Sequence, residues 1–546
     1  MNNPFQKIQG VFSVITPIYG DSWRTFSKFF SALNQQDYTY FEVVVVFDGE
    51  NKKGVKELAK HTALYPKMKV RSLIIPHGGA PAARNAGAKV AIGDYFTFLD
   101  PDVYPLSETF RQWANAFESY PEKDVIWGLY SFIREDKAYS LPDSIPKSAD
   151  GIPDYWAFRF MNYCSGMFPM RKASFVGWDE TVKSLQDWDM WQRMLLLDNF
   201  KGEKFHYIAK SFCLTEPVAE GGISWDSHTH WKERVSYIRE KNGIPRSPIC
   251  VTSLGAPFVG LHVAKKLGAD YLPMPSFKEH DYKAIYLLGF YPGPGGPTKT
   301  HLAVFAEPGH VRNDEKGLPD VQAYFKGKKI IHFIGTDILK LRTEVPFVTL
   351  KYLRDLWKEN EFTLLSEFEM AQEELKELAI DTKIVPIPPD KLFNPLPLPT
   401  QFTVGIYENG TQNMYHEPLM EAVVRSMPDV QFYFFGDNTK KGNKGDNYEH
   451  LGWINLDEWM PKFSCNLRMT IHDGLPLTPL QFLTAGRSVV CNTELHGAVY
   501  ALPERKAVIE ALRSAQDSPI DPKSASYWAK KLDFATYTKT ITALCN

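Results

Sequence analysis

Short apolar runs alternate with segments of helical spacing along this chain. Residues 41–47 form a nearly continuous apolar run, which is typical of a strand buried on both faces of a sheet. Residues 12–16 have the composition of a strand, and between these two runs the apolar side chains of residues 23–33 recur at helical spacing. Because strands that alternate with helices form a mainly parallel sheet, we predict an α/β fold with its site at the carboxyl ends of the strands.

The same alternation continues toward the end of the chain. We expect further helices at residues 53–64, 417–425 and 524–545. We expect further strands at residues 69–75, 95–99, 284–288, 301–306, 329–334, 347–349, 402–406, 431–435 and 488–491. The composition turns to Gly, Pro and Ser near residues 243–248, and the six prolines of residues 385–399 are typical of a stiff linker. These two breaks predict three domains, at residues 1–245, 246–395 and 396–546.

Length and composition limit the class of protein. A chain of 546 residues is long enough for two or three domains, each with its own core. Its six cysteines include no C-x-x-C pair, so we interpret them as reduced core thiols rather than as a disulfide framework or a zinc site. The net charge of −2 lacks the basic excess of a protein that is held on nucleic acid by phosphate contacts.

Neither a secretory signal nor a membrane span is visible in the sequence. The first ten residues lack the basic-then-apolar pattern of a signal peptide, and no apolar run approaches the roughly 20 residues that cross a bilayer. We therefore expect a soluble, cytoplasmic protein without a transmembrane segment.

Two carboxylates follow the predicted strand at residues 95–99. Asp100 and Asp102 lie one residue apart beyond this buried strand, where they can share a hard divalent cation that bridges diphosphate oxygens. Sugar transfer from a nucleotide sugar needs such a cation for the leaving diphosphate, and a carboxylate base for the attacking hydroxyl. The alternative is an Asp-Pro turn that only ends the strand.

Five sequence blocks occur in a specific order. They are VITPIY at residues 14–19, VVVFDG at residues 44–49, PAARNAG and IGDY within residues 81–95, the Asp100 and Asp102 pair, and VGWDE and QDWDMW within residues 176–191. In this order they resemble the inverting family-2 glycosyltransferases of GT-A fold. The resemblance implies that residues 1–245 bind a nucleotide sugar and use a divalent cation, Mn²⁺ or Mg²⁺. A UDP-sugar is the donor that the resemblance favours.

The resemblance also implies a role for individual residues. Asp187 matches the family's base, which deprotonates the acceptor hydroxyl, while Gln186 stands where the family usually has Glu. Asp187 is also a good N-cap for a helix that follows it, and both roles can coexist.

The remaining implied residues hold the donor and the metal. The nucleobase would be held by Thr16, Pro17, Tyr19 and Asp48. Arg84 would lie near the uridine or the phosphates, Asp100 near the ribose, and Asp102 on the metal. As a further metal ligand we choose His228, in the segment at residues 222–230. The alternatives are that Arg84 is a solvated charge on a helix and that the histidines of this segment are only exposed or hydrogen-bonded.

The chain from about residue 247 onward resembles, with fewer matches, a family-4 glycosyltransferase, whose GT-B fold is a pair of Rossmann-like domains. The matching segments are residues 331–337, 432–437, 451–453, 473–481 and 485–490. Two positions depart from the family: Gln481 replaces the Glu that holds the donor ribose, and Glu408 follows a strand where a basic residue is expected. Because an acid there opposes the binding of a diphosphate, we favour a catalytically silent module over a second active transferase.

We therefore predict a metal-dependent inverting glycosyltransferase that moves a sugar from a nucleotide sugar to an acceptor hydroxyl. Two alternatives are a bifunctional transferase with both sites active and a catalytically silent carbohydrate-binding or scaffold protein. The acceptor is left open among glycans, proteins, small glycosides and modified bases of nucleic acid, although the near-neutral charge disfavours nucleic acid. The oligomeric state is left open as well.

Overall fold

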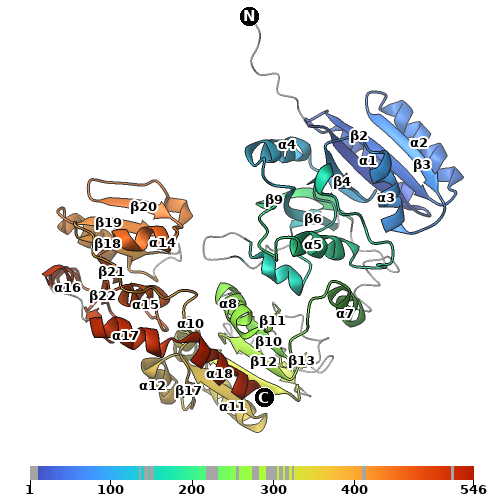
Figure 1. Cartoon of the computed structure of the whole chain (residues 1–546). Helices are drawn as coiled ribbons and strands as arrows, with labels where there is room; N and C mark the ends of the chain where they lie inside the picture. Colours follow the sequence, from blue (N-terminus) through green and yellow to red (C-terminus); the bar gives the residue numbers. More distant parts are fainter. Residues whose placement is uncertain are drawn as a thin grey trace, which may run out of the picture. The chain divides into compact units, whose positions relative to one another are not determined.

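The protein divides into two compact units. The computed structural model describes residues 10–134, 137–140, 147, 153–216, 231–253, 257–272, 282–290, 304–305, 311–313, 319–321, 325–408, 414–517 and 522–546. Unit 1 comprises Met1–Pro146 and Ile152–Arg246, and unit 2 comprises Lys147–Gly151 and Ser247–Asn546. Each unit is a layered arrangement of helices and sheets (Figure 1).

Unit 1 is built on one mixed sheet, which contains nine strands within the described residues. The strands are β1 (Phe12–Ile18), β2 (Phe41–Asp48), β3 (Lys69–Ile75), β4 (Tyr95–Phe98), β5 (Val103–Pro105), β6 (Val125–Arg134), β7 (Lys137–Ser140), β8 (Met170–Arg171) and β9 (Phe205–Thr215). Their order is β3-β2-β1-β4-β8-β6-β9-β5, with β7 paired to β6. The strands β1 to β4 are parallel, whereas β8 runs antiparallel to β4 and β6. The predicted parallel sheet is therefore the N-terminal half of a larger mixed one.

Helices cover the parallel half of this sheet. Within the described residues, the helices of unit 1 are α1 (Phe26–Asn34), α2 (Lys52–Leu64), α3 (Ala80–Val90), α4 (Thr109–Ser119), α5 (Gln186–Leu196) and α7 (Trp231–Lys241). The four valines from Val43 to Val46 are all fully buried, which agrees with the prediction of a strand covered on both faces. Gly87 lets α3 lie close to β1, because a Cβ at this position would come within 2.5 Å of Ile15 Cγ2.

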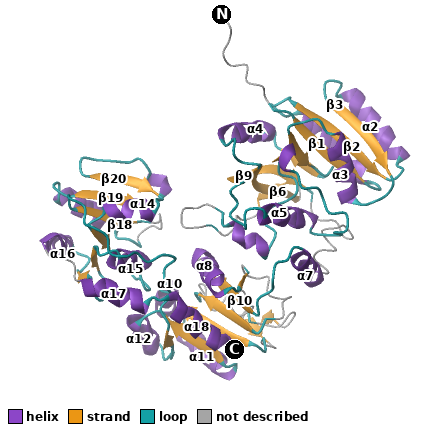
Figure 2. Ribbon diagram, viewed as in Figure 1, coloured by secondary structure: helices purple, strands orange, loops and turns teal. Residues whose placement is uncertain are grey.

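Unit 2 contains two parallel sheets (Figure 2). In its described part, the first sheet has the order β11-β10-β12-β15-β16-β17 and the second has the order β20-β19-β18-β21-β22-β23. The first is formed by β10 (Ile249–Ser253), β11 (Asp270–Tyr271), β12 (Ala284–Leu288), β15 (Lys328–Phe333), β16 (Phe362–Ser366) and β17 (Lys383–Ile384). The second is formed by β18 (Thr403–Tyr407), β19 (Gln431–Phe435), β20 (Tyr448–Gly452), β21 (Cys465–Arg468), β22 (Ser488–Cys491) and β23 (Val499–Tyr500). A short antiparallel pair joins β13 (Val311–Asn313) to β14 (Pro319–Val321).

Helices join most of these parallel strands. They are α8 (Pro257–Leu267), α10 (Thr336–Thr343), α11 (Phe347–Glu359), α12 (Glu369–Glu377), α13 (Glu417–Ser426), α14 (Leu456–Trp459), α15 (Leu477–Thr484) and α16 (Arg505–Asp517), followed by α17 (Pro522–Lys531) and α18 (Phe534–Cys545). The last helix returns to the first sheet of the unit, where the Tyr537 hydroxyl lies 2.9 Å from the Tyr286 hydroxyl. The Tyr286 hydroxyl in turn lies 2.6 Å from His332 Nδ1.

One predicted strand is wrong. Residues 347–349 were expected to be extended because Phe, Val and Thr favour strands, but they form the first turn of α11. Leu350, Leu353 and Trp357 are buried along this helix, so its apolar side chains recur at helical spacing over a longer window than the three residues considered. The predicted helix at residues 524–545 is two helices, α17 and α18, and most of the predicted strand at residues 301–306 lies outside the described residues.

The cysteines are free and buried, as predicted: Cys164, Cys213, Cys250, Cys465, Cys491 and Cys545. Within the part of the chain that the structure describes, every helix is too short or too polar to span a lipid bilayer.

Candidate active site

Asp48 anchors the loop that leads into α3. Its carboxylate accepts hydrogen bonds from the backbone N–H groups of Gly78 (2.7 Å) and Gly79 (3.0 Å) and lies 2.9 Å from His77 Nδ1. Asp48 is 5% exposed at the end of β2, so its oxygens are occupied by the protein itself. The structure therefore gives Asp48 a positioning role at the edge where the nucleobase was predicted to bind.

An exposed aromatic pair lies beside this anchor. The Tyr19 ring, 63% exposed, stacks on the His77 ring with centroids 4.7 Å apart and planes 20° apart. Tyr19 was predicted from the sequence, whereas His77 was missed. The available signal was its position immediately before Gly78-Gly79, at the entrance to the helix of the PAARNAG block.

Thr16 and Pro17 lie within β1 rather than beyond it. Thr16 is fully buried, and its hydroxyl has no hydrogen-bond partner among the described residues. Pro17 is half-buried and pairs in register with Val46 of β2. The structure thus brings Pro17 toward the open edge but keeps Thr16 in the core.

Arg84 joins two distant segments of the chain. Its guanidinium donates to both oxygens of Asp100, at 2.8 and 3.0 Å, and to Gln186 Oε1 at 3.0 Å. It also lies over the Trp178 ring, 4.6 Å from the ring centroid. Only 9% of Arg84 is exposed, which contradicts the alternative of a solvated surface charge. Arg84 lies in the second turn of α3, since this helix already begins at Ala80.

Asp102 is a carboxyl group with a raised pKa at this edge. Burial and the nearby charge of Asp100 raise the pKa of Asp102 to about 6, while Arg84 acts in the opposite direction. Glu216 lies close by, because its backbone N–H donates to the Asp102 carbonyl at 3.2 Å. The Glu216 carboxylate is held by Lys28 (2.7 Å) and by the Tyr104 hydroxyl (3.1 Å). Glu216 was not singled out in the sequence.

Asp187 lies in the first turn of α5. The N-cap of this helix is Leu185, so Asp187 is not the predicted cap; instead it accepts the N–H of Trp188 at 2.9 Å. Burial raises the pKa of Asp187, while hydrogen bonds from Trp188 and Asn162 and the charge of Arg84 counteract this effect. A half-buried carboxylate with these few partners can still accept a proton.

The second acid of this helix has a different environment. Asp189 is fully buried and bonded to Arg193 (2.9 Å), Lys241 (2.7 Å) and Asn242 (3.2 Å). Its charge is therefore compensated by two cations and an amide, which is typical of a structural ion pair. Of the two aspartates of the QDWDMW block, Asp187 is therefore the one that no lysine or arginine side chain bonds within the described residues.

The chemistry of Asp100 and Asp102 fits a divalent cation. Burial first, and then the charge of Asp100, disfavours the ionised form of Asp102, and a hard cation beside Asp102 would offset both effects. Among the described residues, no three His, Cys, Asp or Glu side chains gather into a metal-binding cluster. His228 lies outside the described residues.

Glu408 and Gln481, the two residues of unit 2 that differ from the family-4 pattern, are both bonded to other residues of the unit. Glu408, at the end of β18, lies 3.1 Å from Lys440 Nζ and 2.7 Å from His450 Nδ1. Gln481 of α15 donates to the Lys391 carbonyl at 3.1 Å, which ties this helix to the proline-rich segment. Gly335 precedes α10, and a Cβ added to Gly335 would lie 2.6 Å from the backbone nitrogen of Gly474. The loop at Gly474 therefore already fills the space beside the N-terminus of α10.

A parallel sheet whose carboxyl edge carries an exposed aromatic pair, a buried arginine and several carboxylates is the kind of site at which α/β enzymes bind nucleotides. Within this class, residues 13–177 match the family model described as Glycosyl transferase family 2. Unit 1 therefore contains a family 2 glycosyltransferase domain.

Similar proteins carry related names. An uncharacterized glycosyltransferase of Rickettsia felis is 26% identical over 294 residues, which are 51% of this chain and 48% of that protein. The poly(ribitol-phosphate) beta-N-acetylglucosaminyltransferase TarS of Staphylococcus aureus is 34% identical over 117 residues, which are 21% of this chain and 20% of that protein. The chain thus spans less than half of the length of either relative.

Among solved structures, S. aureus TarS 1–349 in complex with UDP-GlcNAc is 21% identical, with a TM-score of 0.35. The match covers 42% of this chain and 66% of that one.

Proposed function

We propose that the protein is a metal-dependent inverting glycosyltransferase that moves a sugar from a nucleotide sugar to an acceptor hydroxyl. A UDP-sugar is the donor that we favour. The observation that carries the proposal is the pair of contacts made by Arg84, to Asp100 on one side and to Gln186 on the other. These contacts bring the carboxylate of Asp100, beyond β4, next to Gln186, the residue that precedes Asp187. Asp100 is therefore bonded to a guanidinium whose charge also acts on Asp102 and Asp187.

Donor binding begins at the exposed edge. The stacked rings of Tyr19 and His77 offer a flat apolar face to a nucleobase, with Pro17 beside them on β1. Asp48 supports this platform by holding His77 and the two glycines that follow it. Arg84 and Asp100 would lie toward the ribose and the phosphates.

Asp102, with Asp100 beside it, would hold the divalent cation. When bound there, Mn²⁺ or Mg²⁺ supplies positive charge to the diphosphate that leaves. The relative TarS is named for N-acetylglucosaminyl transfer, so UDP-GlcNAc is the first donor to test.

Asp187 is the proposed base. Its carboxylate takes the proton of the acceptor hydroxyl while the hydroxyl oxygen attacks the anomeric carbon. The bond between this carbon and the diphosphate breaks on the opposite side, so one displacement inverts the configuration. Burial supports this role, because a raised pKa strengthens a carboxylate as a base.

The test is the release of UDP from UDP-GlcNAc, UDP-glucose and UDP-galactose by the full chain with Mn²⁺. Asp187→Asn is expected to lower the rate by about 10²- to 10⁴-fold, the usual contribution of a general base. Asp37→Asn, at an exposed ion pair with Arg111, is the matched control and should leave the rate unchanged. Equal rates in the two variants would contradict the proposed base, and the anomeric configuration of a product would test inversion.

We further propose three domains, at residues 1–245, 246–395 and 396–546, the last two forming a GT-B-like pair that is catalytically silent. Glu408, with its lysine and histidine partners, and the filled space above α10 both support a silent module. The competing proposal is a bifunctional transferase. Because Asp187→Asn is expected to leave about a hundredth of the rate or less, transfer that persists near the wild-type rate in this variant would favour an active site in unit 2.

A further inference from the structure

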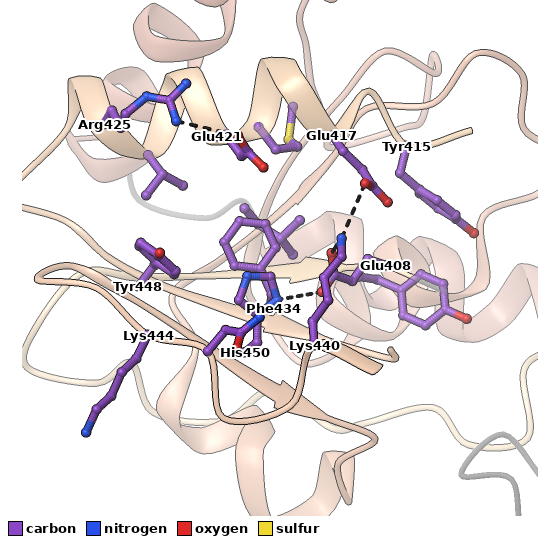
Figure 3. A pocket seen from close by; sticks show the side chains of 15 residues that line it. Glu408, Tyr415, Glu417, Glu421, Arg425, Phe434, Lys440, Lys444, Tyr448 and His450 are labelled. Atoms are coloured by element: carbon purple, nitrogen blue, oxygen red, sulfur yellow. Dashed lines mark hydrogen bonds and ion pairs between the residues drawn. The ribbon is translucent and has the colours of Figure 1, made fainter. Parts of the chain in front are cut away.

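A cavity lies on the second sheet of unit 2, where a crossover helix is replaced by a loop. β18 and β19 are parallel and joined through α13. β19 and β20 are also parallel, but their connection, which is described throughout, contains only the short turn at Asn438–Lys440. Because such crossovers are right-handed, a helix here would lie beside α13 on the same face of the sheet. The uncovered face leaves a cavity of about 610 Å³ between α13 and β20 (Figure 3).

The floor of this cavity is apolar and aromatic. Every second residue of a strand faces the same side, which brings Ile406 of β18, Phe434 of β19 and His450 of β20 to the cavity. The rings of Phe434 and His450 stack with centroids 4.5 Å apart and planes 15° apart. Val424 of α13 closes the floor from the helix side.

The rim carries charges of both signs. Lys440 reaches across from the loop, with Nζ 3.1 Å from Glu408 and 3.3 Å from Glu417 (Figure 3). On α13, Arg425 lies 3.5 Å from Glu421. Acids and bases therefore balance around the opening, and they present hydrogen-bond acceptors and donors side by side.

We propose that this cavity binds an uncharged sugar residue of the acceptor glycan. A sugar ring can place its apolar face on an aromatic floor while its hydroxyls exchange hydrogen bonds with carboxylates and amines. A nucleoside diphosphate fits less well, because Glu408 and Glu417 already neutralise Lys440. A wholly apolar ligand would take these charged groups out of water without offering them a hydrogen bond. The volume lies within the range of about 300–1,000 Å³ that is usual for small-molecule sites.

The identity of the ligand as an acceptor rests on the proposed function of unit 1. Binding of a sugar to the cavity does not depend on that function, so the sugar site and the proposed function can fail separately. Release of UDP from a UDP-sugar by the wild-type chain measures the function, and binding of free sugars measures the site.

The test is saturation-transfer NMR of the full chain with cellobiose, N,N′-diacetylchitobiose and glucose 1-phosphate. Glu421→Trp places a large side chain in the cavity from an exposed position of α13. Ser426→Trp, exposed on the same helix but outside the cavity lining, is the matched control. Thermal unfolding of both variants checks that they are folded.

We expect a neutral disaccharide to bind the wild-type chain and Ser426→Trp alike, and Glu421→Trp at least tenfold more weakly. The proposal is overturned if neither disaccharide binds the wild-type chain, or if the two tryptophan variants bind the disaccharide equally. It is also overturned if Glu421→Trp weakens the binding of glucose 1-phosphate and not that of the disaccharides. Sugar binding without UDP release would retain the sugar site and contradict the proposed function.

Discussion

At the scale of single residues, the candidate active site is organised by one buried cation. Arg84 bonds to Asp100 and Gln186, and its charge also acts on Asp102 and Asp187. Gln186 is neutral, and its amide N–H donates to the Lys183 carbonyl at 3.0 Å, so it adds no negative charge beside Asp187. Arg84 is therefore available to favour the ionised form of Asp187 against the effect of burial.

Replacing the neutral amide of Gln186 by a carboxylate tests whether Arg84 favours the ionised form of Asp187. Gln186→Glu would place a second carboxylate on Arg84, which would raise the pKa of Asp187 further above its ordinary value. Tyr130 and Cys164 also interact with Asp187, but a phenol and a thiol are neutral near pH 7, and burial raises both pKa values further. Since the base must be ionised, the acidic limb of the pH profile for UDP release should move to higher pH.

The matched control is Gln35→Glu, which adds the same charge at an exposed position after α1. It should leave the pH profile in place. A profile for Gln186→Glu that overlays the wild-type curve would show that Arg84 does not support the ionisation of Asp187.

At the scale of secondary-structure elements, a buried carboxyl group joins two loops of unit 2. Glu367 follows β16, and its carboxyl accepts the N–H of Leu475 at 3.0 Å, in the loop before α15. Burial, with the charges of Asp337 and Asp473 nearby, raises the pKa of Glu367 to about 8. Glu367 is therefore protonated at neutral pH in the folded protein, although it would be ionised in the unfolded chain.

This difference predicts how stability depends on pH. Between about pH 4.5 and pH 8 the folded state retains a proton that the unfolded chain releases, so stability falls as the pH rises through this window. Glu367→Gln still offers an oxygen to Leu475 but cannot ionise. Its melting temperature should match that of the wild type near pH 4 and exceed it by several degrees at pH 8.

The exposed substitution Glu373→Gln on α12 serves as the control for the loss of a carboxyl group. If the melting temperatures of Glu367→Gln and of the wild type differ by the same amount at pH 4 and pH 8, Glu367 is not protonated in the folded state.

At the scale of the whole molecule, the two compact units have cores of their own. One hydrophobic cluster gathers buried residues from Phe12 to Ile244 in unit 1, and another gathers residues from Val404 to Ala515 in unit 2. Because the donor site is proposed in unit 1, a nucleotide should stabilise that unit selectively.

Calorimetry of the full chain should therefore resolve two transitions. UDP with Mn²⁺, at about a hundred times its dissociation constant, should stabilise unit 1 by about 2.7 kcal/mol and shift only one transition upward. A single transition, or an equal shift of both, would contradict independent units with the nucleotide site in one of them.

Much of the fold could be predicted from periodicity. The strands at residues 69–75, 284–288, 431–435 and 488–491 have the bounds that were expected, because each is a short run rich in apolar side chains without helical spacing. Residues 347–349 were misassigned because a short window cannot separate a strand from the start of an amphipathic helix. The surroundings of Asp48, Arg84 and Asp187 depend on contacts between distant segments, so His77, Trp178 and Glu216 had no signal strong enough to select them.

The amino-acid sequence by itself determined the alternation of strands and helices, the family 2 domain and the identity of the acids at the ends of β4 and at the start of α5. These properties depend on local periodicity and on short blocks of residues. Contacts between distant segments set the groups that surround each acid: Asp189 is bonded to two cations while Asp187 is not, and Arg84 lies between Asp100 and Gln186. Burial and charge act through space, and these distances exist only when segments about a hundred residues apart pack together.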